Sequence, residues 1–127
     1  MLSWLFGSAN RKRDTEIERA RQLMEPENSA SVEFNFESPA YVKAVRIFQH
    51  LGDHPVVAGE KDRIIDPAFD RRYQAIRKEM EANEVDAARR HIDFMEGLFP
   101  RDLLLEDLGE RLRGLGGESK HHSVRPT

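Results

Sequence analysis

The apolar positions of residues 39–51 recur every three or four residues, which places them on one face of a helix. This face consists of Tyr41, Ala44, Val45, Phe48 and Leu51. Ser38 followed by Pro39 is typical of a helix start, because serine caps the first turn and proline suits the first helical position. We therefore expect a helix at 39–51, ended by Gly52 and central to the core.

The same period continues through residues 67–98 and predicts two helices separated by a short break at residues 83–84. The apolar stripe of the first contains Phe69, Tyr73, Ile76 and Met80, and that of the second contains Val85, Ala88, Ile92 and Met95. Together they predict an αα-hairpin at 67–98. Another helix is expected at 101–113, where leucines recur at helical spacing before a glycine-rich stretch.

Residues 31–37, SVEFNFE, break this helical period. Val32, Phe34 and Phe36 alternate with polar residues, which is typical of a half-buried β-strand. A strand needs a partner to complete its hydrogen bonds. We expect that partner either in a small hairpin at residues 55–65 or in a second chain.

These patterns predict a mainly α-helical fold of about four to five helices, with a small α+β fold as the alternative. We expect an N-terminal amphipathic segment at 1–24 and a polar linker at 25–31. A single globular, mainly helical domain should follow at 32–113, with a flexible tail at 114–127.

The opening stretch MLSWLFG, followed closely by RKR, has three interpretations. Its apolar residues share one helical face, so residues 2–13 could lie in an anionic membrane interface. The same aromatic side chains could fill a pocket of a partner protein, or cap this protein's own core. An export signal is not expected, because the positive charge follows the apolar run instead of preceding it.

Composition narrows the function further. Charged residues make up 34% of the chain and hydrophobic residues 39%, which indicates a small core under a charged surface. The absence of cysteine excludes disulfides and thiolate metal sites, and is typical of a small soluble cytoplasmic protein, with the inner face of a membrane as the alternative location. The net charge is −3, and no segment is strongly basic, which makes nucleic acid an unfavoured partner.

The best candidate for a metal site is the sequence HLGDH, with His50, Asp53 and His54. Gly52 and Pro55 are expected to break the helix there. His50 and His54, four positions apart, would then not share a helical face, and we predict no metal. Catalytic serine motifs and phosphate-binding glycine loops do not occur. His91 is expected to be a histidine at the edge of the core with a hydrogen-bonded ring. We therefore predict no enzymatic activity and no cofactor.

The sequence thus predicts a small non-catalytic protein-binding module, acting as an adaptor, inhibitor or assembly factor. The identity of the partner is open, and a homo-oligomer is allowed. The residues expected to contact the partner are Trp4, Leu5, Phe6, Val32, Phe34 and Phe36.

Two alternatives have their own candidate residues. A peripheral membrane protein anchored by residues 2–13 would contact lipid phosphates through Arg11, Lys12 and Arg13. A DNA-binding regulator would use the helical hairpin at 69–98, with its phosphate contacts made by Arg71, Arg72, Arg89 and Arg90.

Overall fold

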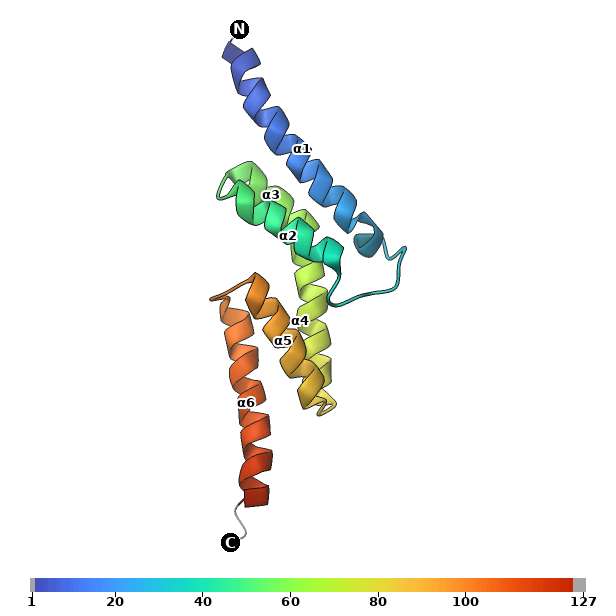
Figure 1. Ribbon diagram of the computed structural model, residues 1–127, viewed down its shortest axis with the longest axis vertical. Coiled ribbons are helices and arrows are strands. Elements are labelled where there is room, and N and C mark those ends of the chain that lie inside the picture. The colour runs from blue at the N-terminus through green and yellow to red at the C-terminus, as the bar shows by residue number, and fades with distance from the viewer. Residues whose placement is uncertain (1, 125–127) are drawn as a thin grey trace. The chain divides into compact units, whose positions relative to one another are not determined.

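Six helices form the described backbone, residues 2–124, of the computed structural model (Figure 1). Side chains are described for residues 11–115. The helices are α1 (Leu2–Asn28), α2 (Pro39–Leu51), α3 (Pro55–Ile64), α4 (Asp66–Glu81), α5 (Val85–Leu98) and α6 (Leu103–Val124). Residues 2–124 contain no strand. The mainly α-helical fold is therefore confirmed, whereas the expected short strand and the count of four to five helices are wrong.

The chain divides into two compact units, Met1–Asp70 and Arg71–Thr127. The first contains α1, α2, α3 and the start of α4, and the second contains the rest of α4 with α5 and α6. The sequence analysis placed one globular, mainly helical domain at 32–113, and this division of the chain stays a prediction.

In the first unit, α1 packs against α2 and α3, and α2 packs against α3. The predicted apolar face of α2 is buried through Tyr41, Ala44, Val45 and Phe48. The predicted start of this helix is also confirmed. The Ser38 hydroxyl accepts a hydrogen bond from the backbone N–H of Tyr41 at 3.3 Å, and Pro39 occupies the first turn.

Residues 31–37 form an irregular loop and not a strand. Helix α1 continues past Pro26, and the backbone N–H of Ser31 returns to the carbonyl of Pro26 at 2.9 Å. A turn then closes with the N–H of Ser38 on the carbonyl of Asn35 at 3.2 Å. The alternation that predicted a strand does not define one buried face here, because Phe36 is buried while Val32 and Phe34 are exposed.

The hairpin expected at 55–65 is likewise wrong, because these residues form α3. His54 caps this helix: its ring Nδ1 accepts a hydrogen bond from the backbone N–H of Val56 at 3.2 Å. Pro55 occupies the first turn of α3, where the N–H that proline lacks would have no partner within the helix. Val57 and Ile64, seven positions apart, are buried on one helical face. Tertiary packing therefore overrides the β-branched residues that suggested a strand.

In the second unit, α5 packs against α6. The helices expected at 67–82 and 85–98 occur as α4 and α5, and Asn83 between them has a left-handed backbone with φ of 60°. Asp102 caps α6, since its Oδ1 accepts a hydrogen bond from the N–H of Leu105 at 3.1 Å. The backbone of α6 extends through the glycine-rich stretch to Val124, beyond the end expected at residue 113.

Two glycines should respond in opposite ways to alanine. Gly52 ends α2 with φ of +77°, so Gly52→Ala should lower the free energy of unfolding by about 1 kcal/mol. Gly97 lies inside α5, with open space where a Cβ would stand, so Gly97→Ala should raise it by roughly 0.5–1 kcal/mol. Urea unfolding followed by circular dichroism measures both. Effects of the same sign would contradict these backbone assignments.

Candidate functional site

The loop between α1 and α2 carries an exposed aromatic side chain supported by a buried one. Val32 and Phe34 are 55% and 42% exposed, whereas Phe36 is buried. The rings of Phe34 and Phe36 meet edge to face, with centroids 6.3 Å apart and planes at 74°. This is a favourable aromatic geometry, so the buried ring supports the exposed one. The loop thus presents an ordered apolar surface.

The charge of this loop is one-sided. Glu33 and Glu37 flank the aromatic residues and are both exposed. Residues 25–38 contain two further glutamates, Glu25 and Glu27, and no lysine or arginine. The loop therefore combines an apolar centre with an acidic border.

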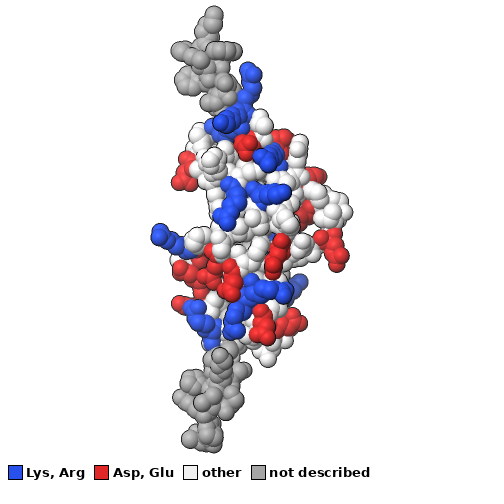
Figure 2. Space-filling view, in the orientation of Figure 1, with Lys and Arg blue, Asp and Glu red and all other residues white. Residues whose placement is uncertain are grey.

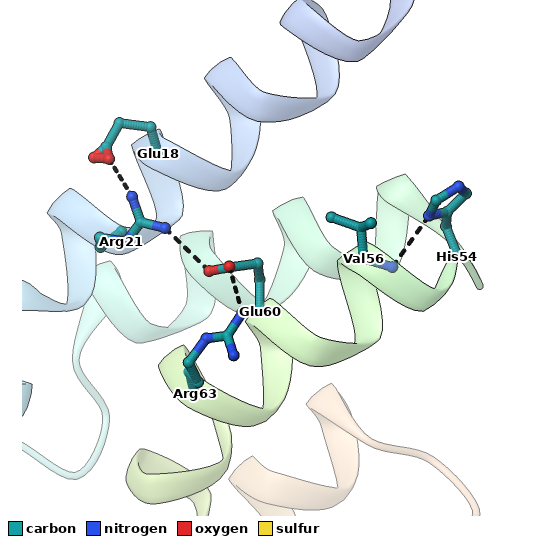
Figure 3. Close-up of polar contacts among 6 residues, drawn as sticks. All are labelled: Glu18, Arg21, His54, Val56, Glu60 and Arg63. Atoms are coloured by element: carbon teal, nitrogen blue, oxygen red, sulfur yellow. Dashed lines mark hydrogen bonds and ion pairs between the residues drawn. The ribbon is translucent and has the colours of Figure 1, made fainter.

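The base of the loop is tied to α3 by contacts between residues distant in the sequence. Asn28, the last residue of α1, donates a hydrogen bond from its side-chain amide to the carbonyl of Ile64 at 3.0 Å. Seven residues earlier in α1, the guanidinium of Arg21 reaches Glu60 of α3, with Nη2 and Oε2 3.0 Å apart (Figure 3). These contacts place the start of the loop relative to α3.

Glu60 is the centre of a small ion-pair network (Figure 3). Its second oxygen accepts a hydrogen bond from Arg63 Nη2 at 2.6 Å, and Arg21 also pairs with Glu18. The hydrogen bond from Arg63, followed by that from Arg21, holds the pKa of Glu60 below its ordinary value. The hydrogen bond to Glu60 correspondingly raises the pKa of Arg21. Both effects favour the charged forms across the α1–α3 contact.

The other residues predicted to contact a partner lie near the N-terminus. The backbone of residues 2–10 belongs to α1, but the side chains of Trp4, Leu5 and Phe6 lie outside the described residues. Their role as a docking surface, membrane contact or core therefore stays a prediction. Among the described residues, no helix combines the length and apolar character needed to cross a membrane.

The basic cluster at residues 11–13 does not act as one exposed patch. Arg11 and Lys12 are exposed, whereas Arg13 is half-buried. Its Nη1 lies 3.2 Å from Nε2 of His54, and its buried Nε has no hydrogen-bond partner. One of the three predicted phosphate contacts is thus directed toward the α2–α3 connection of its own chain.

The four arginines proposed for DNA contact are also dissimilar in their surroundings. Arg89 and Arg90 are exposed, Arg71 is half-buried and Arg72 is completely buried. Basic and acidic side chains are interspersed over the described surface in Figure 2. The set therefore does not form a uniform basic surface of the kind that binds phosphates.

The last three residues of the HLGDH sequence, Gly52, Asp53 and His54, line a cleft of about 620 Å³ between the end of α2 and the start of α3. Asp53 and His54 lie at this cleft together with Phe48 and Lys61, while His50 is not among its lining residues. Both ring nitrogens of His54 are occupied, Nδ1 by the cap of α3 and Nε2 by Arg13. Within the described residues, no three His, Asp or Glu side chains are grouped so that they could hold a metal ion.

The ring of His91 is hydrogen-bonded, as the sequence analysis expected. Its Nδ1 lies 2.8 Å from the carboxylate of Glu79, and both side chains are mostly buried. The pair joins α5 to α4. Sequence analysis did not identify Glu79 as the partner of His91, or Glu60 as the partner of Arg21. These contacts join residues on different helices and leave no periodic signal in the sequence.

No family model matches the chain, and neither a curated protein nor a solved structure matches it. The functional argument therefore depends on the residues themselves, and on the loop at 31–37 in particular.

We expect Glu60→Gln to lower the free energy of unfolding by roughly 0.5–1 kcal/mol at neutral pH, because the amide loses the charge attraction to Arg21 and Arg63. The folded-state pKa of Glu60 is lowered, so its contribution is present above the unfolded pKa and disappears as the pH falls through the folded pKa. Urea unfolding at several pH values should therefore show the variant approaching the wild type in acid.

Asp66→Asn is the control of opposite sign. Burial, and then the neighbouring carboxylate of Asp62, raise the pKa of Asp66, while Lys61 opposes this rise. The side chain of Asp66 is 54% exposed, so the cost of its charge at neutral pH is small, and the asparagine variant should be about as stable as the wild type there. A destabilised asparagine variant, or a Glu60→Gln effect that does not change with pH, would show that these electrostatic assignments are wrong.

Proposed function

We propose that this chain is a small protein-binding module without catalysis, which acts as an adaptor, inhibitor or assembly factor. Its contact surface is the loop at 31–37. One observation carries this proposal: Phe34 is exposed on the loop between α1 and α2 while its ring packs against the buried ring of Phe36.

An aromatic side chain held in this way is suited to binding. Burial of a large apolar ring in a partner's pocket supplies much of the free energy of a typical protein interface. A ring whose position is already set loses little conformational entropy on association. Val32, two positions before Phe34, is also exposed and adds apolar surface to the loop. Phe36 is buried and would not contact the partner directly; its ring packs against that of Phe34 and holds it in place.

The charge of the loop specifies the chemistry of the partner. Glu33 and Glu37 would meet the rim of the interface, where charges mainly affect the association rate and the choice of partner. We therefore propose a partner protein with an apolar pocket bordered by lysine or arginine. Such an association should weaken with added salt, because the charges at the rim are screened.

The first test is to find the partner with a photo-crosslinking residue placed at position 34 in the full chain, in lysate of the source cells. A matched probe at Val56 is the control, because Val56 is also exposed but lies on α3 and outside the loop. Capture of one protein from position 34 and not from position 56 is expected. Equal capture at both positions, or none at position 34, would count against the loop as the contact surface.

With the purified partner, we expect Phe34→Ala to weaken binding by about 30-fold, as typical for the loss of a central aromatic contact. Val56→Ala should leave the affinity unchanged. Calorimetry measures both, and circular dichroism verifies that each variant is folded. An affinity unaffected by Phe34→Ala would refute the proposal.

A further inference from the structure

Helix α6 has both buried and exposed leucines. Leu105, Leu108 and Leu112 are buried and form the inward face of this helix. Three further leucines are exposed on the same helix: Leu103 at 78%, Leu104 at 51% and Leu115 at 37%. Exposed leucines at helical spacing indicate a surface that binds another apolar surface.

Two of the exposed leucines belong to one stripe. Leu104, Leu108, Arg111 and Leu115 follow one another at intervals of four, three and four residues, and so lie along one side of α6. The part of this side from Leu108 to Leu115 borders a groove of about 370 Å³, whose opposite wall is formed by residues of α4 that include Met80. Leu103 lies about a quarter turn or more away from the stripe.

The spacing of the stripe is the same in both directions along the helix. If α6 of a second copy lies antiparallel on this side, Leu104 faces Leu115 of the second copy, and Leu115 faces Leu104 of the second copy. In the same register Arg111 comes to the level of Leu108 of the second copy, which is buried within its own unit. A surface that matches itself after reversal is what a twofold-symmetric dimer requires.

The charges beside the stripe select the same orientation. Asp107 lies beside the stripe and Arg111 lies within it; both are largely exposed, and they pair within the helix at 3.0 Å between Oδ2 and Nε. Antiparallel pairing brings Asp107 beside Arg111 of the second copy, and Arg111 beside Asp107 of the second copy. Parallel pairing would place the Asp107 side chains of the two copies on opposite edges of the interface, so it would not gain these contacts between opposite charges.

We infer that α6 pairs with α6 of a second copy in antiparallel orientation, and that Leu104 and Leu115 become buried in this contact. The occupant of this surface is thus the chain itself. The loop at 31–37 belongs to the other unit of the chain, so this inference and the proposed function stand or fall separately.

Sedimentation velocity of the full chain over a range of concentrations tests the inference, with a concentration-dependent dimer expected. Leu104→Glu should raise the dissociation constant by about tenfold or more, because it places a charge in the interface. Leu103→Glu is the matched control: it makes the same change at an exposed neighbouring leucine outside the stripe, and should leave dimerisation unchanged. A chain that remains monomeric at every concentration overturns the inference, even if the stripe binds another protein.

Charge reversal tests the register. Asp107→Arg and Arg111→Asp should each weaken self-association about tenfold, because like charges then meet across the interface. An equal mixture of the two variants should associate at about the wild-type strength, since the arginines of one chain then face the aspartates of the other. Damage to the individual helices would not be repaired by mixing. Failure of the mixture to associate overturns the antiparallel register.

The orientation has a covalent test, because the chain contains no cysteine. A mixture of Leu104→Cys and Leu115→Cys chains should form a mixed disulfide-linked dimer under mild oxidation. Leu104→Cys alone should crosslink to itself far less, because in the antiparallel register its two copies lie apart. Preferential self-crosslinking of Leu104→Cys would show that the pairing is parallel and would overturn the inference.

Discussion

Burial of the apolar face of α2 against α1 and α3 is the contact on which the first unit depends. Tyr41, Ala44, Val45 and Phe48 are almost inaccessible to solvent. Full burial of a large apolar side chain contributes about 1.5–3 kcal/mol, which exceeds what an exposed ion pair supplies. The hydrophobic contact therefore holds the three helices together, and the polar contacts then adjust how they meet.

The loop at 31–37 derives its order from this packing. It begins where α1 ends, and Asn28 at that end is hydrogen-bonded to the carbonyl of Ile64 in α3. It finishes at Ser38, which caps α2. With both ends held and Phe36 buried between them, Phe34 remains at the surface in a defined position. An exposed aromatic residue on an ordered loop results from the way in which the helices on both sides are anchored.

In the second unit, the leucines of α6 are only partly buried. One face of α6 is covered by packing within the unit, and Leu105, Leu108 and Leu112 are buried there. Leu104 and Leu115 lie beside that face and are left partly exposed, and Leu115 lines the groove that borders α4. A helix that is apolar over more than one face needs a second contact, and the symmetric spacing of its stripe allows a second copy to supply it.

Local signals in the sequence were sufficient to predict the helices at 39–51, 67–82 and 85–98, because spacing, a serine cap and turn-forming residues all act within a few positions. They were insufficient at 31–37 and 55–65, where Phe34 and Val57 belong to stretches with strand-like composition. Whether such a stretch becomes a strand depends on a partner elsewhere in the chain, and packing against α1 and α2 favoured helix α3 instead. The sequence alone determined the positions and apolar faces of the helices at 39–51, 67–82 and 85–98. Only the tertiary structure decided that Phe36 is buried while Phe34 is exposed, and that Glu60 meets Arg21, because these contacts join segments far apart in the chain.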